Sequence, residues 1–142
     1  MQRRLLLVAA GLIALLAGCG QKDPFSYVKI SGKVTYEDGS TLPAVVQLRF
    51  YPQSPPLDGK TYPRVGAGLT DAEGKYRSIT SHLAGDGVVR GKHNVTLSTP
   101  KGGRLPPDMV PPEYNSFDKT PLLVDTADPR TFNLKIRKPT TK

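Results

Sequence analysis

Apolar and polar side chains alternate in short runs along most of the chain. In the first run the apolar positions on one face are Val28, Ile30, Val34 and Tyr36. An alternation with a period of two is typical of a half-buried β-strand. Gly32 falls on the same face and predicts either a bulge or a close approach of another backbone there.

Six further runs have the length and pattern of strands. The expected strands are 28–36, 45–51, 64–70, a short one opening at Tyr76, 88–99, 122–124 and 132–136. Their apolar faces include Val46, Leu48 and Phe50 in the second, Val95 and Leu97 in phase with His93 in the fifth, and Phe132, Leu134 and Ile136 in the last. The segments 52–63 and 100–121 are rich in proline, which cannot donate to a sheet ladder, so both are expected to be loops.

These runs predict an all-β fold. About seven short strands separated by turn signals are typical of an antiparallel sandwich, in which two sheets bury the alternating apolar residues between them. The 14 glycines and 14 prolines disfavour long helices. We expect this domain to span 27–137.

Two turn signatures separate the first strands. The residues Asp38 and Gly39 predict a hairpin turn, because Asp-Gly suits the positive dihedral angles that such turns require. In the second turn Asp71 is expected to accept backbone hydrogen bonds and Gly74 to take a positive φ. Tyr76 follows directly and is expected to close one end of the sandwich.

The two segments that carry these turns resemble a known family. SGKVTYEDGSTLPAVVQLRFYP and GAGLTDAEGKYRSIT together are similar to signatures of carboxypeptidase-regulatory-like, transthyretin-like domains, over roughly residues 28–136. The resemblance implies a prealbumin-like Greek-key sandwich, a scaffold used for adhesion, extension and binding, and the fold alone implies no activity. Ile79 departs from strict alternation after Tyr76 and predicts a bulge or an early end to that strand.

The first 18 residues have a different pattern. Arg3 and Arg4 precede the uncharged run 5–17, which is shorter than the roughly 20 residues that a membrane-spanning helix needs. The run is apolar on all faces, whereas a surface helix of a globular domain carries an apolar stripe. A basic start followed by a short apolar run predicts a signal peptide at 1–18.

The end of this leader, Leu16-Ala17-Gly18-Cys19, resembles the lipobox of bacterial lipoproteins. That resemblance implies cleavage before Cys19, a diacylglyceryl group on its thiol, and fatty-acyl chains such as palmitate. Two acyl chains are enough for stable attachment to a membrane. Lipidation would also account for the single cysteine of an exported chain, because a thioether cannot form an unwanted disulfide.

The expected mature protein is therefore a lipoprotein of the bacterial cell envelope. Residues 19–26 would be a lipidated tether and 138–142 a basic tail. Because Gly20, not aspartate, follows the cysteine, similarity to the enteric sorting rule favours the periplasmic face of the outer membrane or the cell surface. The segment PPEYNSFDKTPLLVDT also resembles a feature of small bacterial lipoproteins with this domain.

The charge of the chain limits its partners. Twenty basic and 12 acidic residues give a net charge of +8, and removal of two leader arginines leaves 18 − 12 = +6. Such a balance suits anionic lipid or acidic polysaccharide. Export and the lack of a basic motif interleaved with aromatic residues argue against nucleic acid.

The sequence contains none of the hydrolase, phosphate-binding or zinc-protease motifs that we sought. No catalytic residue or cofactor is therefore expected, although an envelope hydrolase acting through Asp71, Glu73 or Asp86 is an alternative. His82 and His93 with Asp86 lack metal-ligand spacing, and the Asp71 segment lacks the later ligands of a calcium loop. No metal site is expected.

Three tyrosines lie near prolines: Tyr51, Tyr62 and Tyr114. They are candidates for a surface that contacts polysaccharide or a peptide, and the alternative is packing of tyrosine on proline within the loops. The expected function is a non-catalytic module for binding an envelope protein or polysaccharide, or for envelope structure. A periplasmic carrier of a small ligand is the alternative, and it would need an apolar pocket.

Overall fold

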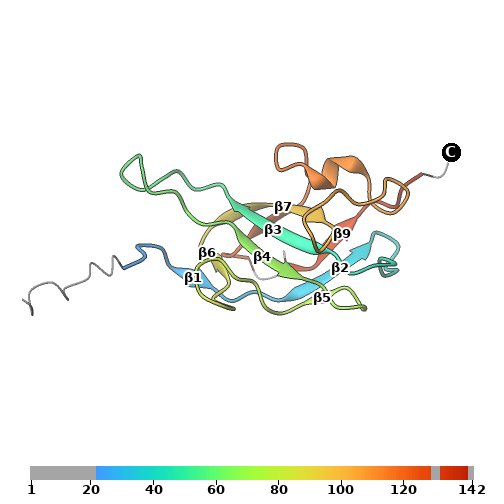
Figure 1. Cartoon of the computed structure of the whole chain (residues 1–142), viewed down its shortest axis with the longest axis horizontal. Helices are drawn as coiled ribbons and strands as arrows, with labels where there is room; N and C mark the ends of the chain where they lie inside the picture. Colours follow the sequence, from blue (N-terminus) through green and yellow to red (C-terminus); the bar gives the residue numbers. More distant parts are fainter. Residues whose placement is uncertain (1–21, 129–131, 141–142) are drawn as a thin grey trace, which may run out of the picture.

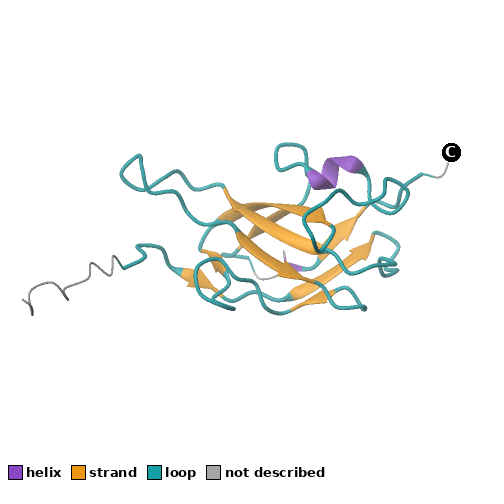
Figure 2. Cartoon of the chain, in the orientation of Figure 1, coloured by secondary structure: helices purple, strands orange, loops and turns teal. Residues whose placement is uncertain are grey.

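Two layers of short strands form the fold (Figures 1 and 2). The computed structural model describes residues 22–128 and 132–140, so the leader and Cys19 lie outside the described residues. The strands are β1 (Tyr27–Val28), β2 (Gly32–Tyr36), β3 (Gln47–Pro52), β4 (Gly66–Leu69), β5 (Lys75–Tyr76), β6 (Val88–Val89), β7 (Lys92–Ser98), β8 (Leu123–Asp125) and β9 (Leu134–Ile136), and a 3-10 turn, η2 (Pro112–Asn115), precedes β8.

The strands form three sheets. One layer is the antiparallel sheet β4-β3-β7-β8, and the other holds the sheet β5-β2-β9, with the pair β1-β6 beside it where the chain enters the domain (Figure 1). The strands β2 and β9 run parallel, with Val34 opposite Leu134. The expectation of an all-β antiparallel sandwich is confirmed, and β2-β9 is a parallel pair within it.

The alternating apolar residues fill the space between the layers. The buried inward side chains of β2, β3, β7 and β9 are Val34, Tyr36, Leu48, Phe50, Val95, Leu97, Leu134 and Ile136. Burial of one such side chain contributes roughly 1.5–3 kcal/mol to stability. The period-two pattern therefore identified the inward faces of these four strands correctly.

Nine strands are present in the described residues, not about seven, because two of the expected strands each divide. The run 28–36 becomes β1, which pairs with β6, and β2, which pairs with β5 and β9. The run 88–99 divides at Gly91, whose φ of 130° turns the chain between β6 and β7. Alternation continues through both breaks, so it does not reveal them.

The hairpin expected at Asp38-Gly39 is wrong, although the turn itself is present. Gly39 has a φ of 84°, and the backbone N–H of Ser40 donates to the Asp38 carboxylate at 2.9 Å. However, β2 pairs with β5 and β9, while β3 pairs with β4 and β7. The turn therefore passes the chain from one sheet to the other.

The glycines of β4 form its buried face. A Cβ added at Gly68 would lie 2.5 Å from Cδ1 of Ile79, and one added at Gly66 would lie 3.0 Å from its Cγ2. Leu69, on the opposite face from Gly68, is 50% exposed. Strand β5 ends at Tyr76, the early end that the position of Ile79 predicted. The chain then lies beside β4, where Thr80 pairs with Ala67, and Ile79 fills the space over the glycines.

A tight turn leads from β4 to β5 and lies against β2. The Asp71 carboxylate accepts hydrogen bonds from the backbone N–H groups of Glu73, at 3.0 Å, and Lys75, at 2.8 Å. The Gly74 carbonyl accepts a hydrogen bond from the N–H of Val34 at 2.8 Å. Gly74 has a φ of 78°, and a Cβ there would lie 2.5 Å from the Val34 carbonyl oxygen.

The turn delivers Tyr76 into the core. Its side chain is only 1% exposed, its ring lies 6.0 Å from that of Phe50, and its hydroxyl donates to the Phe132 carbonyl. Burial raises the pKa of Tyr76. A Cβ at Gly32 would lie 2.7 Å from the Tyr76 hydroxyl, so Gly32 makes the close approach that its place in the sequence suggested.

Replacement of Gly74 with alanine is expected to lower the free energy of unfolding by about 2 kcal/mol or more, from a strained dihedral angle together with a clash. Gly39→Ala is the matched control, because Gly39 shares the positive φ but an added Cβ would meet nothing within 4 Å. It should cost roughly 1 kcal/mol. Urea unfolding followed by circular dichroism measures both, and equal losses would contradict the close approach at Gly74.

Candidate binding site

A groove of about 830 Å³ opens where the segment 100–119 covers β7. Its size lies within the range of small-molecule sites. Its apolar lining consists of Leu97, Leu105, Val110, Pro106, Pro107, Pro111 and Pro112. The polar residues around it are Arg104, Glu113, Asn115, Ser116 and Lys119.

The wall of this groove is built from prolines and is attached to the rest of the domain by side-chain hydrogen bonds. Proline has a fixed φ and no N–H, so a proline-rich wall leaves fewer backbone donors to satisfy. The turn η2 is attached to β7 by the side-chain amide of Asn115, which donates to the Leu97 carbonyl at 2.9 Å. Tyr114 is buried behind the wall and accepts a hydrogen bond from the N–H of Arg137 at 2.9 Å. The hydroxyl of Tyr36 donates to the Met109 carbonyl at 2.8 Å.

The charges at the groove favour an anion. Glu113 is paired with the guanidinium of Arg137. Arg104 and Lys119 are exposed, and neither forms an ion pair with any residue of 22–128 or 132–140. An apolar floor beside two available cations suits a ligand that carries a carboxylate or phosphate next to an apolar part.

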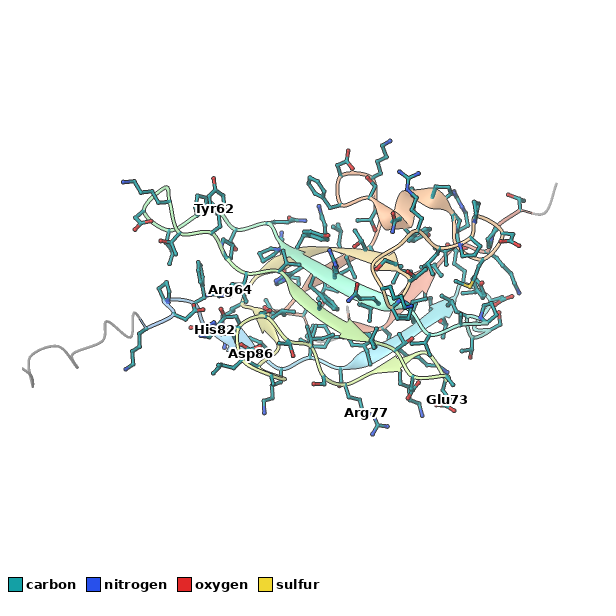
Figure 3. The ribbon with its side chains drawn as sticks, viewed as in Figure 1. Tyr62, Arg64, Glu73, Arg77, His82 and Asp86 are labelled. Atoms are coloured by element: carbon teal, nitrogen blue, oxygen red, sulfur yellow. The ribbon has the colours of Figure 1, made fainter. Side chains whose placement is uncertain are left out.

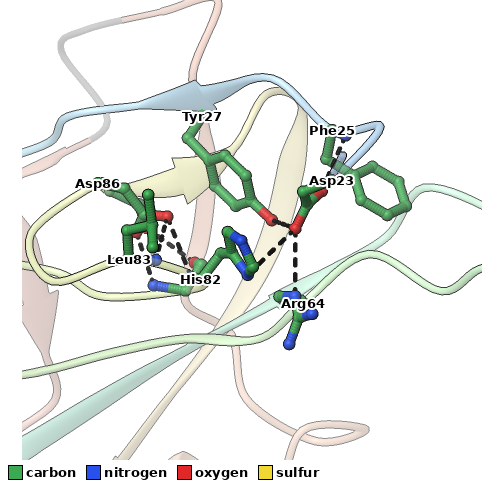
Figure 4. Close-up of polar contacts among 9 residues, drawn as sticks. Asp23, Phe25, Tyr27, Arg64, His82, Leu83 and Asp86 are labelled. Atoms are coloured by element: carbon green, nitrogen blue, oxygen red, sulfur yellow. Dashed lines mark hydrogen bonds and ion pairs between the residues drawn. The ribbon is translucent and has the colours of Figure 1, made fainter. Parts of the chain in front are cut away.

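A second polar site lies where the chain enters the domain (Figure 4). The Asp23 carboxylate accepts hydrogen bonds from the N–H of Phe25, at 3.0 Å, and the hydroxyl of Tyr27, at 2.7 Å. It also pairs with Nε of Arg64, at 3.2 Å, and Nδ1 of His82, at 3.4 Å. The Phe25 N–H is the largest influence that lowers the pKa of Asp23. Burial, with the hydrogen bond to Asp23, raises the pKa of Tyr27 to about 12.

Asp86 organises the loop that presents His82. Its carboxylate accepts hydrogen bonds from the backbone N–H groups of Ser81, His82 and Leu83, at 2.9, 3.0 and 2.8 Å. The His82 ring is stacked on that of Tyr27, with 6.3 Å between centroids. A smaller groove of about 580 Å³ lies beside this site, bounded by the tether and the 57–64 loop.

The three candidate tyrosines do not form one surface. Tyr62 is 72% exposed on the loop between β3 and β4, Tyr51 lies against Phe117 with 5.7 Å between ring centroids, and Tyr114 is buried. Sequence reasoning did not identify the proline-lined groove, with Arg104 and Lys119 at its edge. The available signal was the pair of Pro-Pro steps at 106–107 and 111–112, interpreted only as loop chemistry.

The residues considered for metal binding or catalysis are dispersed. His93 is in the interior and His82 is at the surface. Among residues 22–128 and 132–140 no group of three or more His, Cys, Asp or Glu side chains could hold a metal ion. The Asp71 and Asp86 carboxylates are occupied by backbone N–H groups, and Glu73 projects from the turn at the far end from His82 (Figure 3).

No known protein family, curated protein or solved structure matches this chain. Within the described ranges no helix is both long and apolar enough to cross a membrane.

His93 predicts a pH-dependent stability. Its side chain is 1% exposed, neither ring nitrogen reaches a hydrogen-bond partner among the described residues, and the Phe50 ring meets it edge-on. Burial lowers its pKa below 6.5, and the Gly91 backbone and the Asp125 carboxylate oppose this only in part. His93 therefore binds a proton more readily in the unfolded chain than in the folded chain. The free energy of unfolding should fall as the pH drops below about 6.5.

We expect His93→Leu to reduce this loss by up to about 1.4 kcal/mol per pH unit. Urea unfolding at several pH values between about 7 and 5 measures the slope. Leu48→Val is the matched control, because it alters an equally buried side chain that does not titrate, and it should leave the slope of the wild type unchanged. A slope that His93→Leu does not change would show that His93 protonates equally well in the folded state.

Proposed function

We propose that this protein is a lipid-anchored, non-catalytic binding module of the bacterial cell envelope, held by acylated Cys19 and binding its ligand in the proline-lined groove. The anchor is supported by the basic and apolar leader that ends in Leu16-Ala17-Gly18-Cys19. Two acyl chains on one cysteine provide stable attachment without a membrane-spanning helix. The chain emerges from the described domain at Lys22, three residues after Cys19.

The observation that carries the binding role is the pair of available cations, Arg104 and Lys119, at the edge of a preformed apolar groove. The segment that builds this groove lies on the side of the sandwich away from the incoming tether (Figure 1). An anchored domain in this arrangement presents the groove away from the membrane. The ligand class is an amphipathic anion, either a small molecule or an acidic unit of a polysaccharide.

The placement of the carboxylates favours binding over hydrolysis. Asp71 and Asp86 each accept several backbone hydrogen bonds that hold a loop in shape. A carboxylate engaged in this way serves the local structure. Neither Asp71, Glu73 nor Asp86 lines the groove.

The anchor is tested by expression of the full chain in a bacterial host, followed by detergent phase partition and mass spectrometry. Wild-type protein should enter the detergent phase as a chain that begins at an acylated Cys19. Cys19→Ala should remain in the aqueous phase or keep its leader. Partition of both proteins into the aqueous phase would refute the lipoprotein assignment.

The groove is tested by thermal shift with two anionic probes, decanoate and oligogalacturonate, each compared with its uncharged ester. We expect one acid to raise the melting temperature through preferential binding to the folded state, and its ester to do so much less. Arg104→Gln combined with Lys119→Gln should weaken binding by roughly tenfold or more. The matched control is Lys75→Gln with Arg77→Gln, two exposed cations outside the groove. A shift that the Arg104 and Lys119 replacements leave intact would place the ligand elsewhere.

A further inference from the structure

The Asp23 contacts determine which end of the domain faces the anchor. Its carboxylate is bonded to side chains from β1, from the segment before β4 and from the loop after Thr80. Cys19 lies four residues before Asp23, and four extended residues span at most roughly 14 Å. Acyl chains on Cys19 would therefore hold this end of the sandwich close to the lipid headgroups.

Exposed apolar side chains are concentrated at that end. Among the described residues seven large hydrophobic side chains are well exposed, and four of these lie on the two loops that flank Asp23. They are Leu57, Tyr62 and Val65 on the loop between β3 and β4, and Leu83 on the loop after Thr80. Tyr62 is 72% exposed and Leu83 is 66% exposed. Figure 3 shows Tyr62, Arg64 and His82 together at the end where the tether enters.

The acidic groups at this end are engaged within the protein, whereas lysines are available. Asp58 accepts the backbone N–H groups of Lys60 and Thr61, at 3.3 and 3.1 Å, and Asp23 and Asp86 are occupied as described. The side chains of Lys22 and Lys60 are exposed and form no ion pair within 22–128 and 132–140. The three carboxylates keep their negative charge and balance Lys22, Lys60 and Arg64 in formal charge, but the two lysine ammonium groups are the charges at this end that no described residue pairs with.

We propose that this end, the tether face formed by Lys22, Leu57, Lys60, Tyr62 and Leu83, lies on the bilayer surface and contacts anionic phospholipid headgroups. The inference rests on the proposed acylation of Cys19, which brings the bilayer to this face. Tyrosine favours the membrane interface, where its ring meets apolar matter and its hydroxyl meets water. Lysines near an anionic surface add electrostatic attraction. The domain is thus held in one orientation, with the proline-lined groove turned outward.

The chain has no tryptophan, so Tyr62→Trp introduces a single fluorescent reporter on the tether face. The acylated protein is reconstituted in vesicles of phosphatidylcholine and phosphatidylglycerol that contain brominated lipid. We expect the emission of this reporter to shift to the blue and to be quenched. Leu69→Trp is the matched control, because Leu69 is 50% exposed at the end of β4, beside the turn that holds Glu73 at the opposite end (Figure 3). Equal quenching at both positions, or none at position 62, would overturn the proposal.

Charge variants and a chain without acyl groups separate this proposal from the anchor itself. A chain beginning at Gly20 retains every described residue and should bind the same vesicles weakly. Lys22→Glu with Lys60→Glu should reduce that binding by roughly fivefold or more, whereas Lys75→Glu with Arg77→Glu should not.

Asp23→Ala, combined with Tyr62→Trp, should leave the acylated chain anchored but reduce quenching of the reporter. If mass spectrometry finds no acyl group on Cys19, the proposed function fails; if the chain is anchored but the reporter at position 62 is not quenched, only the orientation fails.

Discussion

The buried side chain of Tyr76 and the hydrogen bond of its hydroxyl constrain the rest of the sandwich. A buried hydroxyl needs a partner, and the Phe132 carbonyl supplies it. That bond ties β5 to the segment just before β9, and both strands flank β2. The arrangement requires two glycines, because a side chain at Gly32 would meet the Tyr76 hydroxyl and one at Gly74 would meet the Val34 carbonyl. Strand β9, which begins two residues after this carbonyl, pairs with β2 in parallel.

The strands of the sandwich separate the two candidate surfaces, the Asp23 site and the proline-lined groove. Loops that leave β3 and β5 converge on Asp23, while the segment after β7 folds back over that strand as the proline-lined wall. Each surface is held by polar side chains that reach a distant part of the chain: Arg64 and His82 at Asp23, and Asn115 and Tyr114 at the groove. Loops, not strands, build both the membrane contact and the ligand site that we propose.

The first residue of the expected basic tail, Lys138, packs against the domain. Lys138 pairs with Asp38 at 2.6 Å, and its ammonium lies 5.3 Å from the centre of the Tyr36 ring. The turn after β2 is thereby linked to the chain that leaves β9. Of the positive charges at the C-terminal end, Arg137 and Lys138 are thus paired within the domain, whereas Arg104 and Lys119 remain available at the groove.

The sequence by itself determined the class of fold and the inward faces of the main strands. Alternation placed Leu48, Phe50, Val95 and Leu97 inside because a period of two assigns every second side chain to the same face. It also indicated the leader and Cys19 as the anchor that we propose. These are local properties, and local patterns are sufficient for them.

Only the tertiary structure decided which strands are neighbours, which face of β4 is buried, and which loop residues meet. Alternation specifies a face but not a partner, so the pairing of β2 with β9, which lie far apart in the sequence, has no local signal. Strand β4 buries its glycines because Ile79 from another segment occupies the space above them. Asp23 meets Arg64 and His82, both distant along the chain, because the fold brings their loops together. A proline-rich stretch looks like a loop in any sequence, and it becomes a groove only when β7 lies beneath it.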